Sequence, residues 1–525
     1  MKRLPHYLTG VVFLLAALTA VETSHFSLRA DSENKGTGWA MAGQNLANWR
    51  SQTSEKTIGP NNVASLTARW TFTTGGDVSA TPIIAGDTLY FPDWAGSLYA
   101  VDRNSGTLKW SHQISEYDGH QGAISRVSPA VHNKDLILGD MISADKVHAG
   151  ANIMAVRQET GKLHWITQVD SHPAAIITGS PIIAGNVIYV GVSSNEEGLA
   201  KDPTYPCCSF RGSVVALEAS TGHILWKTYT LPDNNGKVDG YSGNAVWQPP
   251  AIDLRRNSLY VGTGNNYEVP DEVKQCLAKT AAIDEVKCFA ADDHFDSALS
   301  LDLLTGRIKW SRRLQGLDVW TVACITNPNP VACPLPNSPD YDLSGSGPNL
   351  LDHIVGFGQK SGVYWALNPQ DGSIVWSSVV GPGSTLGGIE WGTATDGKRI
   401  YVAITNSGHK PYALVGGNTI TWGAWSALDV TTGHILWQTS DPDQNLAMGA
   451  VSVANGVVYA PSFSGNFHAL DSGTGKILWS FQSGGSVIDG PSISNGVVYW
   501  GSGYKKIQPG TPNNKVFAFS LQDSN

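Results

Sequence analysis

Apolar and polar residues alternate in short runs along most of this chain, and the runs end in one recurring kind of turn. An alternating run such as "SLYAVD" leads into a turn with Thr-Gly or an equivalent pair, and a tryptophan follows four residues after the glycine. Alternation with a period of two predicts half-buried strands, and the glycine-bearing turns predict hairpins. The tryptophans that end these units are Trp110, Trp165, Trp226, Trp310, Trp376, Trp437 and Trp479.

Additional strand-like segments between these units, such as "GDTLYFP" and "NGVVYAP", bring each unit to four strands, as in one blade of a β-propeller. An eighth unit is split between the two ends of the chain. The C-terminal "NKVFAFSLQ" lacks a tryptophan, and the N-terminal "SLTARWTFTTG" supplies Trp70. The pattern therefore predicts an all-β fold: one eight-bladed β-propeller over residues 38–525, closed by a blade shared between both termini. The regular spacing marks the repeat tryptophans as packing residues between blades.

The composition agrees with a large globular chain that has many tight turns. Of the 525 residues, 41% are hydrophobic and 15% charged, and the chain contains 57 glycines and 18 tryptophans. Many glycines and aromatic residues are typical of multi-stranded β architectures. The net charge of −9 argues against nucleic acid as a partner.

The first residues predict export from the cytoplasm. Lys2 and Arg3 precede an apolar run from Leu8 to Ala20, which is too short to span a bilayer comfortably. We expect a signal peptide within residues 1–24, with cleavage after Ala20 as the leading candidate and an uncleaved anchor as the alternative. The mature protein is then periplasmic or secreted and does not span the membrane. No cysteine lies near this cleavage site, so we do not expect a lipid anchor.

The six cysteines fit an oxidising compartment. They form three neighbouring pairs, and we expect each pair to be a disulfide, although the sequence alone leaves other connectivities open. The pairs are Cys207/Cys208, Cys276/Cys288 and Cys324/Cys333. The sequence has no Cys-x-x-Cys-His motif, so it encodes no covalently attached haem c.

Several loops depart from the repeat and concentrate oxygen-bearing side chains. They are "VGVSSNEEG", "VGTGNNYEVPDE" and "NSPDYDLSGSGPNLL", and "VGFGQKSGVYW" adds a lysine in a glycine-rich turn. Carboxylate and amide oxygens are the ligands that Ca²⁺ prefers. Histidines do not cluster with these loops, so zinc is not expected there.

The repeat, the adjacent cysteines and these loops together resemble the quinoprotein alcohol dehydrogenases, which bind pyrroloquinoline quinone (PQQ) and Ca²⁺ in an eight-bladed propeller. Within that family the chain is most similar to the polyvinyl-alcohol dehydrogenase branch. The segments that carry the resemblance are "WAMAGQNLANWRSQ", "CCSFRGSVVAL", "HFDSALSLDLLTG", "DYDLSGSGPNLL" and "GQKSGVYWALNP". The resemblance extends from about Gly38 to the C-terminus.

The resemblance implies a set of metal ligands. Glu196 in "SSNEEG" matches the Ca²⁺-binding glutamate, with Glu197 as the alternative. Asn265 in "GTGN" matches the amide ligand, and Asp340 in "PDYD" matches the aspartate that serves as ligand and as catalytic base.

It also implies a set of cofactor contacts. Trp247 matches the tryptophan that stacks under the quinone, and Lys360 stands where the family places a cation beside the reactive quinone oxygens. Arg126, Thr178 and Ser193 match groups that bind the cofactor's carboxylates and carbonyls.

Cys207 and Cys208 raise the question of what covers the second face of the quinone. Adjacent cysteines joined by a disulfide close a small rigid ring. Such a ring is a candidate for a flat lid opposite Trp247, and a purely structural or reduced pair is the alternative. In the better-known methanol and ethanol dehydrogenases the cysteine pair belongs to an earlier loop, so the lid here requires the chain to fold back.

A second departure concerns the base. An insertion from Thr321 to Ser338 separates "LDVW" from "PDYD", which makes Asp318 a competitor of Asp340. Asp342 stands where some relatives use an additional acid for a lanthanide in place of calcium.

We therefore expect a PQQ- and Ca²⁺-dependent dehydrogenase that oxidises secondary alcohols or polyvinyl alcohol to ketones or aldehydes. Because the chain carries no haem, a separate cytochrome c or similar acceptor must remove the electrons. The alternative is a non-catalytic propeller built from PQQ-like repeats that serves as an interaction scaffold, or a relative that binds the cofactor without turnover.

Overall fold

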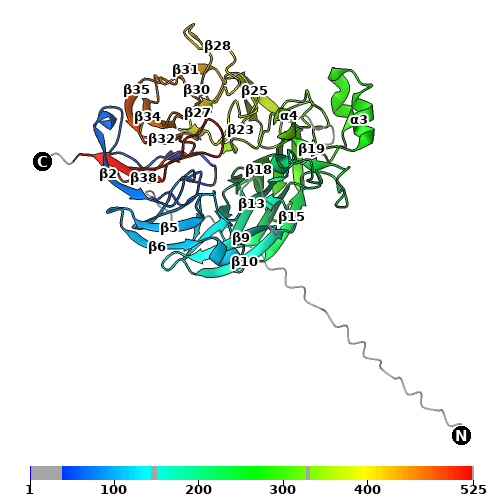
Figure 1. Cartoon of the computed structure of the whole chain (residues 1–525), viewed down its shortest axis with the longest axis horizontal. Helices are drawn as coiled ribbons and strands as arrows, with labels where there is room; N and C mark the ends of the chain where they lie inside the picture. Colours follow the sequence, from blue (N-terminus) through cyan, green and yellow to red (C-terminus); the bar gives the residue numbers. More distant parts are fainter. Residues whose placement is uncertain (2–37, 143–149, 327–331, 523–525) are drawn as a thin grey trace.

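The strands of the computed structural model form eight antiparallel sheets placed around a common axis, which confirms the predicted eight-bladed β-propeller (Figure 1). The structure describes Met1 and residues 38–142, 150–326 and 332–522. The expected signal peptide, residues 1–24, lies outside the described residues apart from Met1.

Blades 1 to 4 each run from an innermost to an outermost strand in chain order. Blade 1 comprises β3 (Ile83–Ala85), β4 (Thr88–Pro92), β5 (Ser97–Asp102) and β6 (Leu108–Gln113). Blade 2 comprises β7 (Ala130–His132), β8 (Asp135–Gly139), β9 (Ala151–Arg157) and β10 (Leu163–Asp170). Blade 3 comprises β12 (Ile182–Ala184), β13 (Val187–Ser194), β14 (Ser213–Glu218) and β15 (Ile224–Tyr229), and β11 (Ala175–Ile176) pairs with β13. Blade 4 comprises β17 (Ala251–Asp253), β18 (Ser258–Gly262), β20 (Ser297–Asp302) and β21 (Ile308–Arg313).

Blades 5 to 7 repeat this order, and blade 8 alone departs from it. Blade 5 comprises β22 (Asn349–Leu350), β23 (Val355–Gly358), β24 (Val363–Leu367) and β25 (Ile374–Val379). Blade 6 comprises β26 (Ala394–Thr395), β27 (Arg399–Ile404), β30 (Ala424–Asp429) and β31 (Ile435–Ser440). Blade 7 comprises β32 (Ser452–Ala454), β33 (Val457–Pro461), β34 (Asn466–Asp471) and β35 (Ile477–Gln482). Blade 8 comprises β36 (Ser492–Ser494), β37 (Val497–Ser502), β38 (Lys515–Leu521) and the N-terminal β2 (Leu66–Thr73).

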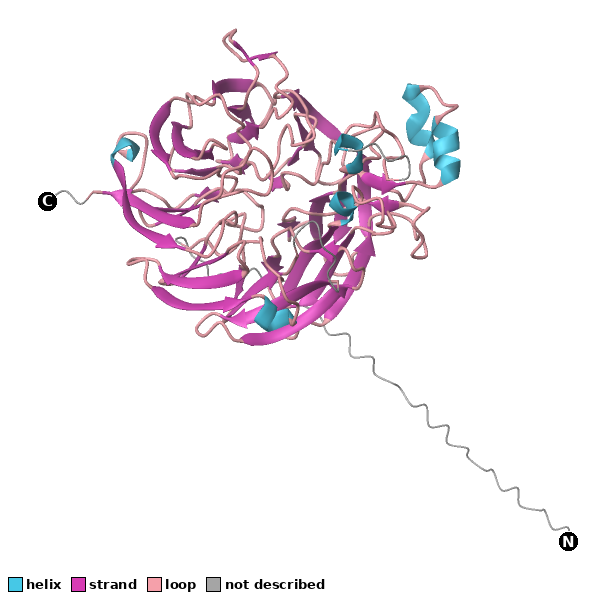
Figure 2. Cartoon of the chain, viewed as in Figure 1, coloured by secondary structure: helices cyan, strands magenta, loops and turns pink. Residues whose placement is uncertain are grey.

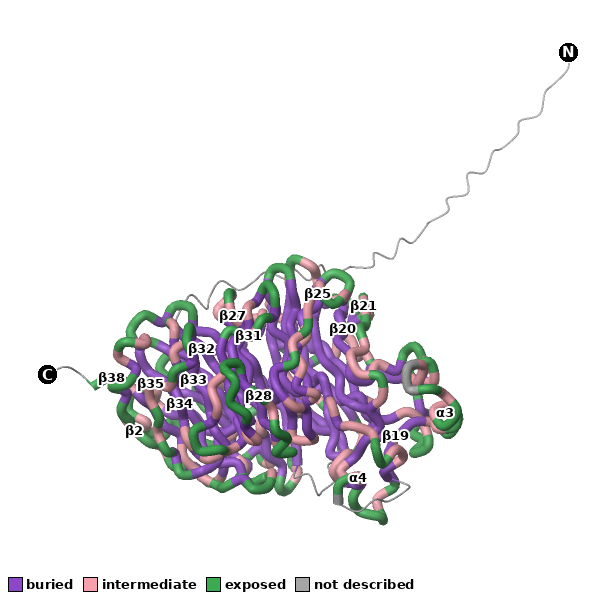
Figure 3. Tube along the Cα trace, turned by 90° about the horizontal axis from the view of Figure 1, so that it is seen from above, coloured by how far each residue is buried: buried purple, intermediate pink, exposed green. Residues whose placement is uncertain are grey.

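The split blade closes the ring. β2, drawn in blue, lies antiparallel beside β38, drawn in red, with Trp70 opposite Ala518 (Figure 1). The two ends of the chain thus share one sheet, and pairing them leaves no open edge between the first and last blades. The tube coloured by burial shows the result: the strands are buried, and the exposed residues gather at turns and on the rim (Figure 3).

The repeat tryptophans link each blade to the next. Their indole N–H groups donate to backbone carbonyl oxygens of the following unit at 2.9–3.2 Å. Trp165 of blade 2, for example, bonds to Ala219 of blade 3, and Trp479 of blade 7 bonds to Leu66 at the start of β2. The ring of contacts is therefore closed through the split blade, as the spacing of the tryptophans predicts.

Each of these tryptophans except Trp479 also explains a glycine in the next blade. At Gly222 a Cβ atom would lie 2.4 Å from the ring of Trp165, and at Gly475 it would lie 2.5 Å from the ring of Trp437. Both glycines have a positive φ, +74° and +73°, a region that side chains disfavour. The recurring glycine therefore meets two demands at once: the shape of the turn and the approach of a tryptophan.

The segment from Trp39 to Gln52, which we call the belt, runs past the innermost strands of all the blades. Its backbone pairs first with Ile84 of blade 1, and Ala40 accepts a hydrogen bond from Val131 of blade 2. Met41 packs against the apolar cluster of blade 3. The remaining contacts follow in blade order: Leu46 with Ile252, Ala47 with Leu350, Trp49 with Thr395, Arg50 with Val453, and Gln52 with Ile493. One short segment thus ties together blades that are far apart in sequence, and its last two residues form β1 (Ser51–Gln52), parallel to β32.

Arg50 is the buried charge at the centre of the belt. Its guanidinium donates to the carbonyl oxygens of Val451 at 2.9 Å and Ala42 at 3.1 Å, and to the hydroxyl of Thr81 at 2.9 Å. Burial lowers the pKa of Arg50 to about 10, and the negative charge of Asp489 partly opposes this shift. Arg50 therefore satisfies carbonyl groups that would otherwise be buried without donors.

Helices are few and short and lie outside the sheets (Figure 2). They are η1 (Val63–Ser65), α1 (Ser115–Asp118), α2 (Glu196–Leu199), α3 (Asp271–Leu277), η2 (Ala282–Cys288) and α4 (Ala323–Thr326). Two small hairpins pair β16 (Ser242–Gly243) with β19 (Asn266–Glu268) and β28 (Tyr412–Ala413) with β29 (Thr419–Ile420). None of the helices in the described part of the chain has the length and apolarity needed to cross a membrane.

Replacing Arg50 with alanine tests the role of the belt. The substitution leaves buried carbonyl groups without a donor and Asp489 without its positive neighbour, so we expect Arg50→Ala to lower the free energy of unfolding by about 3 kcal/mol. Guanidinium denaturation measures the change. Arg69→Ala, on the exposed surface of β2, is the matched control and should alter stability by less than about 0.5 kcal/mol. Equal effects of the two substitutions would contradict a structural role for Arg50.

Candidate active site

The candidate residues emerge on one face of the ring. In an up-and-down blade, the loops that join consecutive blades and the turns between second and third strands lie at the same end. Arg126, Trp247 and Asp340 occupy loops between blades, whereas Asn265 and Lys360 follow the second strands of blades 4 and 5. We call this end of the propeller the site face.

Lys360 joins two of the candidate carboxylates. Its Nζ atom lies 2.8 Å from Oδ1 of Asp340 and 2.8 Å from Oδ2 of Asp342, and all three side chains are buried. Burial raises the pKa of Asp340 to about 7, an effect that Lys360 opposes and Asp342 reinforces. Burial also disfavours the charge of Lys360, but the surrounding carboxylates outweigh it and raise the pKa of the lysine well above its usual value. Lys360 is therefore a permanent cation.

Two more buried aspartates lie beside this group with oxygens that lack partners. Both carboxylate oxygens of Asp296 and the Oδ1 atom of Asp318 accept no hydrogen bond from the protein. The other oxygen of Asp318 accepts the backbone N–H of Tyr341 at 2.6 Å. Burial, with the charges of neighbouring acids, raises the pKa of both aspartates well above the usual range. Buried oxygens without donors indicate room for a cation.

Asn265 is held so that its amide oxygen stays available. Its Nδ2 atom donates to the carbonyl oxygens of Asn266 at 2.9 Å and Trp320 at 2.7 Å, and its backbone N–H donates to Oδ1 of Asp342 at 2.8 Å. The nitrogen end of the side chain is thereby fixed, and the oxygen end is left as a potential ligand. The structure thus brings Asn265 next to Asp342 and, through it, to Lys360 and Asp340.

Glu196, the first candidate for the glutamate ligand, uses its carboxylate oxygens for hydrogen bonds to its own loop. Its Oε1 atom accepts the backbone N–H of Ser209 at 2.9 Å and the hydroxyl of Tyr205 at 3.2 Å, and Oε2 accepts the N–H of Phe210 at 2.7 Å. These donors flank the cysteine pair, so the carboxylate of Glu196 holds the cysteine loop. Its oxygens are therefore already engaged.

Glu197, the alternative ligand, faces the carboxylate group instead. Burial raises its pKa to about 8, with the charge of Lys360 opposing the shift and the charges of Asp340 and Asp342 adding to it. Adjacent residues in the short helix α2 point about 100° apart, because an α-helix has 3.6 residues per turn. The two adjacent glutamates therefore have different surroundings. Glu196 holds the cysteine loop, and Glu197 interacts with the charges of Lys360, Asp340 and Asp342.

Aromatic rings form a wall beside the charged group. The Nζ atom of Lys360 lies 5.7 Å from the ring of Trp247, and Trp247 meets Trp391 edge to face with centroids 5.7 Å apart. The guanidinium of Arg126 lies over Trp391 at 4.5 Å from the ring centroid. The wall thus combines flat apolar surfaces with two cations, a combination suited to a flat anionic ligand.

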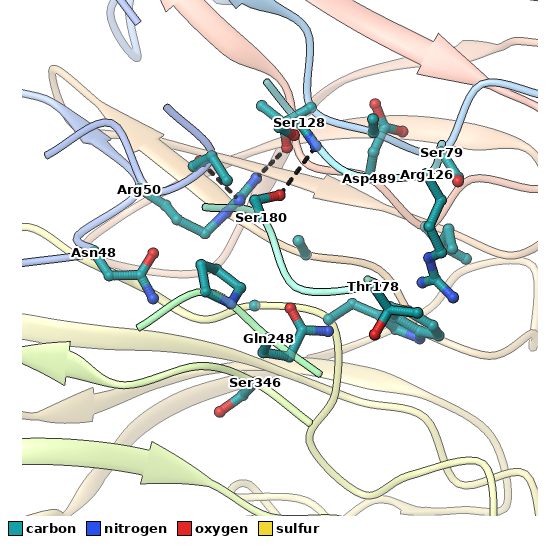
Figure 4. A pocket seen from close by; sticks show the side chains of 18 residues that line it. Asn48, Arg50, Ser79, Arg126, Ser128, Thr178, Ser180, Gln248, Ser346 and Asp489 are labelled. Carbon is teal, nitrogen blue, oxygen red and sulfur yellow. Dashed lines mark hydrogen bonds between the residues drawn. The ribbon is translucent and has the colours of Figure 1, made fainter. Parts of the chain in front are cut away.

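Arg126 and Thr178 also line a small polar cavity of about 50 Å³ beneath this wall. In the close-up they lie together on one side, with Asn48 and Arg50 of the belt on the opposite side (Figure 4). The hydroxyl of Thr178 donates to the carbonyl oxygen of Trp247 at 3.3 Å. Ser193 does not line this cavity; it lies at the end of β13, paired with Ile176 of β11.

All three predicted disulfides are present, at Cys207–Cys208, Cys276–Cys288 and Cys324–Cys333. Cys207 and Cys208 are buried in the same apolar cluster against which Trp247 packs. The lid role of the cysteine pair remains a prediction from the family resemblance.

Two residues of the site went unrecognised in the sequence. Trp391 meets Trp247 edge to face and lies under the guanidinium of Arg126, and Glu390 is buried beside Lys360, where burial raises its pKa to about 8. The available signal was position: Trp391 falls between the repeat tryptophans of blades 5 and 6, where the repeat needs none. Glu390 carried no signal of its own.

Comparison with known proteins leads to the same family as the resemblance seen in the sequence. A family model described as "Glucose/ethanol/alcohol dehydrogenase, beta-propeller domain" matches residues 39–338, and one described as "Outer membrane protein assembly factor BamB" matches residues 423–523. The chain is 31% identical over 512 residues to a polyvinylalcohol dehydrogenase of Sphingopyxis sp. (strain 113P3), a match that covers 88% of this chain and 73% of the relative. It is 24% identical over 411 residues to a quinohemoprotein alcohol dehydrogenase of Comamonas testosteroni, covering 72% of this chain and 51% of the relative.

Solved structures share the architecture at lower sequence identity. The quinohemoprotein alcohol dehydrogenase from Comamonas testosteroni superposes with a TM-score of 0.67 at 17% identity, covering 92% of this chain and 80% of that one. A europium-containing methanol dehydrogenase gives a TM-score of 0.66, also at 17% identity, with 92% and 98% covered. At this identity the likeness demonstrates the fold, while the family follows from the sequence matches. The chain belongs to the PQQ-dependent quinoprotein alcohol dehydrogenase family, with polyvinyl-alcohol dehydrogenases among its relatives.

Proposed function

We propose that this protein is an exported, PQQ- and Ca²⁺-dependent dehydrogenase that oxidises secondary alcohols, including polyvinyl alcohol, and passes the electrons to a separate cytochrome c or similar acceptor. The observation that carries the proposal is the buried group of Asp340, Lys360 and Asp342 beside Trp247. In bound form, PQQ supplies the hydride acceptor and Ca²⁺ the Lewis acid that polarises its carbonyl group.

The residues fit a hard divalent cation. Glu197, Asn265 and Asp340 offer carboxylate and amide oxygens, and the unpartnered oxygens of Asp296 and Asp318 add negative charge nearby. Asp342 is less suited to be an additional ligand, because Lys360 and the N–H of Asn265 already engage its two oxygens. This arrangement favours calcium over a lanthanide that would need that acid.

The residues also fit a flat polyanion. Trp247 and Trp391 supply ring faces, Arg126 and Lys360 supply positive charge, and Thr178 adds a hydroxyl group. The Cys207–Cys208 ring is the proposed lid, because its loop packs in the same cluster as Trp247. Ser193, which lies outside the cavity lining, is kept as a proposed contact through the family resemblance alone.

Asp340 is the proposed base. It accepts the proton of the substrate hydroxyl as a carboxylate, the form that the ammonium group of Lys360 at 2.8 Å favours. Two N–H groups of Lys360 bind Asp340 and Asp342, and the third is left for an oxygen of the cofactor or substrate. Asp318 is the weaker candidate, since one of its oxygens is fixed by a backbone N–H.

A cleft of about 600 Å³ beside this group supports a large neutral substrate. Leu386 in its wall belongs to the apolar cluster that contains Trp391, and Ser384 donates its N–H to the carbonyl of Lys360. The other lining residues are mostly hydroxyl, amide and apolar groups: Ile325, Thr385, Ser407, Gly408, His409, Lys410, Gln444, Asn445, Leu446, Gln508 and Pro509. Alternating CH₂ and hydroxyl groups of polyvinyl alcohol match such a lining.

The alternative is a non-catalytic scaffold, since a BamB model matches residues 423–523. That match covers the end of blade 6 and blades 7 and 8, and it excludes Asp340, Lys360 and Asn265. The scaffold reading therefore explains the repeat but not the buried charged group.

Dye reduction by the purified protein tests the activity. We expect turnover of 2-propanol and polyvinyl alcohol that requires both PQQ and Ca²⁺, and a loss of at least ~100-fold in Asp340→Asn, because the base is removed. Asp239→Asn, at an exposed position, is the control. Loss in Asp318→Asn with retention in Asp340→Asn would transfer the base to Asp318, and no turnover with any alcohol would favour the scaffold.

Calcium binding distinguishes the proposed roles of Glu196 and Glu197. In calcium titrations of the PQQ-loaded protein, Glu197→Gln should weaken Ca²⁺ binding by at least ~10-fold and leave the unfolding midpoint unchanged. Glu196→Gln should bind Ca²⁺ normally but lower stability by about 2 kcal/mol, because an amide cannot accept both backbone N–H groups. The reverse pattern would restore Glu196 as the ligand.

A bulky side chain placed in the cleft tests whether polyvinyl alcohol binds there. Ser407→Trp should lower kcat/KM for polyvinyl alcohol by about tenfold, ~1.4 kcal/mol in the barrier, and leave 2-propanol nearly unaffected. Thr431→Trp, in an exposed turn on the opposite face, is the matched control. An equal loss for both substrates would place the polymer elsewhere.

A further inference from the structure

A second group of metal-binding side chains lies on the site face, in the seam between blades 6 and 7. Asp441 and Asp443 belong to the loop between β31 and β32, and His468 lies on β34. One potential ligand atom from each of the three residues lies within 4.8 Å of the others. No residue of the candidate active site belongs to this group.

The two carboxylates are close together without a compensating cation. Asp441 is only 1% exposed, and its partners are the hydroxyl of Ser462 and the backbone N–H of Asp443. Asp443 accepts hydrogen bonds from Ser464 and Asn466. Within the described parts of the chain, no lysine or arginine forms an ion pair with either aspartate. Two neighbouring carboxylates, one of them buried, are costly without a positive charge.

His468 is the independent indication of a ligand. The side chain is 1% exposed; its Nδ1 atom lies 2.8 Å from Oγ of Ser480, and its Nε2 atom has no hydrogen-bond partner. A neutral imidazole with one nitrogen held by a hydroxyl group and the other free is the usual state of a metal-ligating histidine.

We propose that Asp441, Asp443 and His468 bind a divalent first-row transition metal ion, with Zn²⁺ as the representative. One imidazole nitrogen with two carboxylates is a donor set that Zn²⁺ accepts, whereas Ca²⁺ prefers oxygen ligands alone. Ser462, Ser464 and Asn466 are the supporting groups, because each donates a hydrogen bond to one of the two carboxylates.

The site has a consequence for the cleft described above. Gln444, Asn445 and Leu446, which line the cleft, directly follow Asp443 in the same loop. Backbone hydrogen bonds from Gly423 to Asn445 at 2.9 Å and from Phe463 to Leu446 at 3.0 Å help to hold this loop, in addition to the side-chain bonds to Asp441 and Asp443. A metal ion joining Asp441 and Asp443 to His468 would add a stronger link between this wall of the cleft and the sheet of blade 7.

Zn²⁺ titration calorimetry of the full-length protein tests this site. Excess Ca²⁺ in the buffer occupies oxygen-only sites, so the remaining Zn²⁺ binding reports a site that contains nitrogen. We expect Asp443→Asn and His468→Gln each to weaken one Zn²⁺-binding event by at least ~10-fold. His434→Asn, an exposed histidine in the neighbouring blade, is the matched control and should bind Zn²⁺ as the wild type does.

The design separates binding from folding and from catalysis. Asp443 is exposed, so Asp443→Asn keeps the fold even if the buried His468→Gln does not, and no step uses PQQ or turnover. Zn²⁺ should also raise the unfolding temperature of the wild type and not that of Asp443→Asn, because the ion links loop and sheet. Absence of Zn²⁺ binding in the wild type, its displacement by Ca²⁺, or equal binding in Asp443→Asn would overturn the proposal.

Discussion

The contact between a tryptophan of one blade and a glycine turn of the next is the interaction on which the whole architecture depends. The indole ring covers a glycine that has no room for a side chain, and its N–H group satisfies a backbone carbonyl of the same turn region. The contact repeats from Trp70 to Trp437, and Trp479 makes the matching indole hydrogen bond to Leu66 of the split blade, so each blade is tied to its neighbour in a similar way. Equal orientations around a ring give closure only with the right number of units, and the split blade supplies the last one.

Closure determines where chemistry is possible. The tryptophan–glycine contacts lie on the face of the propeller where the third and fourth strands of each blade are joined. The loops on the opposite face take no part in these contacts. Those loops carry Asp340, Lys360, Asn265, Trp247 and Arg126. A site assembled from loops of several blades has a rigid frame beneath it, which holds buried carboxylate oxygens such as both of Asp296 and Oδ1 of Asp318 without a hydrogen-bond donor.

The electrostatics of the site follow from this frame. Lys360 is the cation shared by Asp340 and Asp342, and further acids surround them. The excess of buried negative charge suits a divalent cation, and burial together with the neighbouring acids raises the pKa values of Glu197, Asp340 and Glu390. Across the small polar cavity from Arg126, Arg50 of the belt uses the same kind of buried charge to hold backbone carbonyl groups.

Local pattern was enough to predict the architecture, because alternation, turn glycines and tryptophan spacing are properties of neighbouring residues. It also predicted the closing blade through Trp70 and the disulfides between neighbouring cysteines. The placement of Asp340 beside Lys360 came from the family resemblance. Tertiary structure alone decided the rest. Which of Glu196 and Glu197 faces Lys360 depends on the rotation of α2. His468 meets the loop between blades 6 and 7, and the contacts of Trp391 and Arg50 join residues from more distant blades. Such contacts leave no periodic trace in the sequence, since each is made once, between loops that only the closed ring brings together.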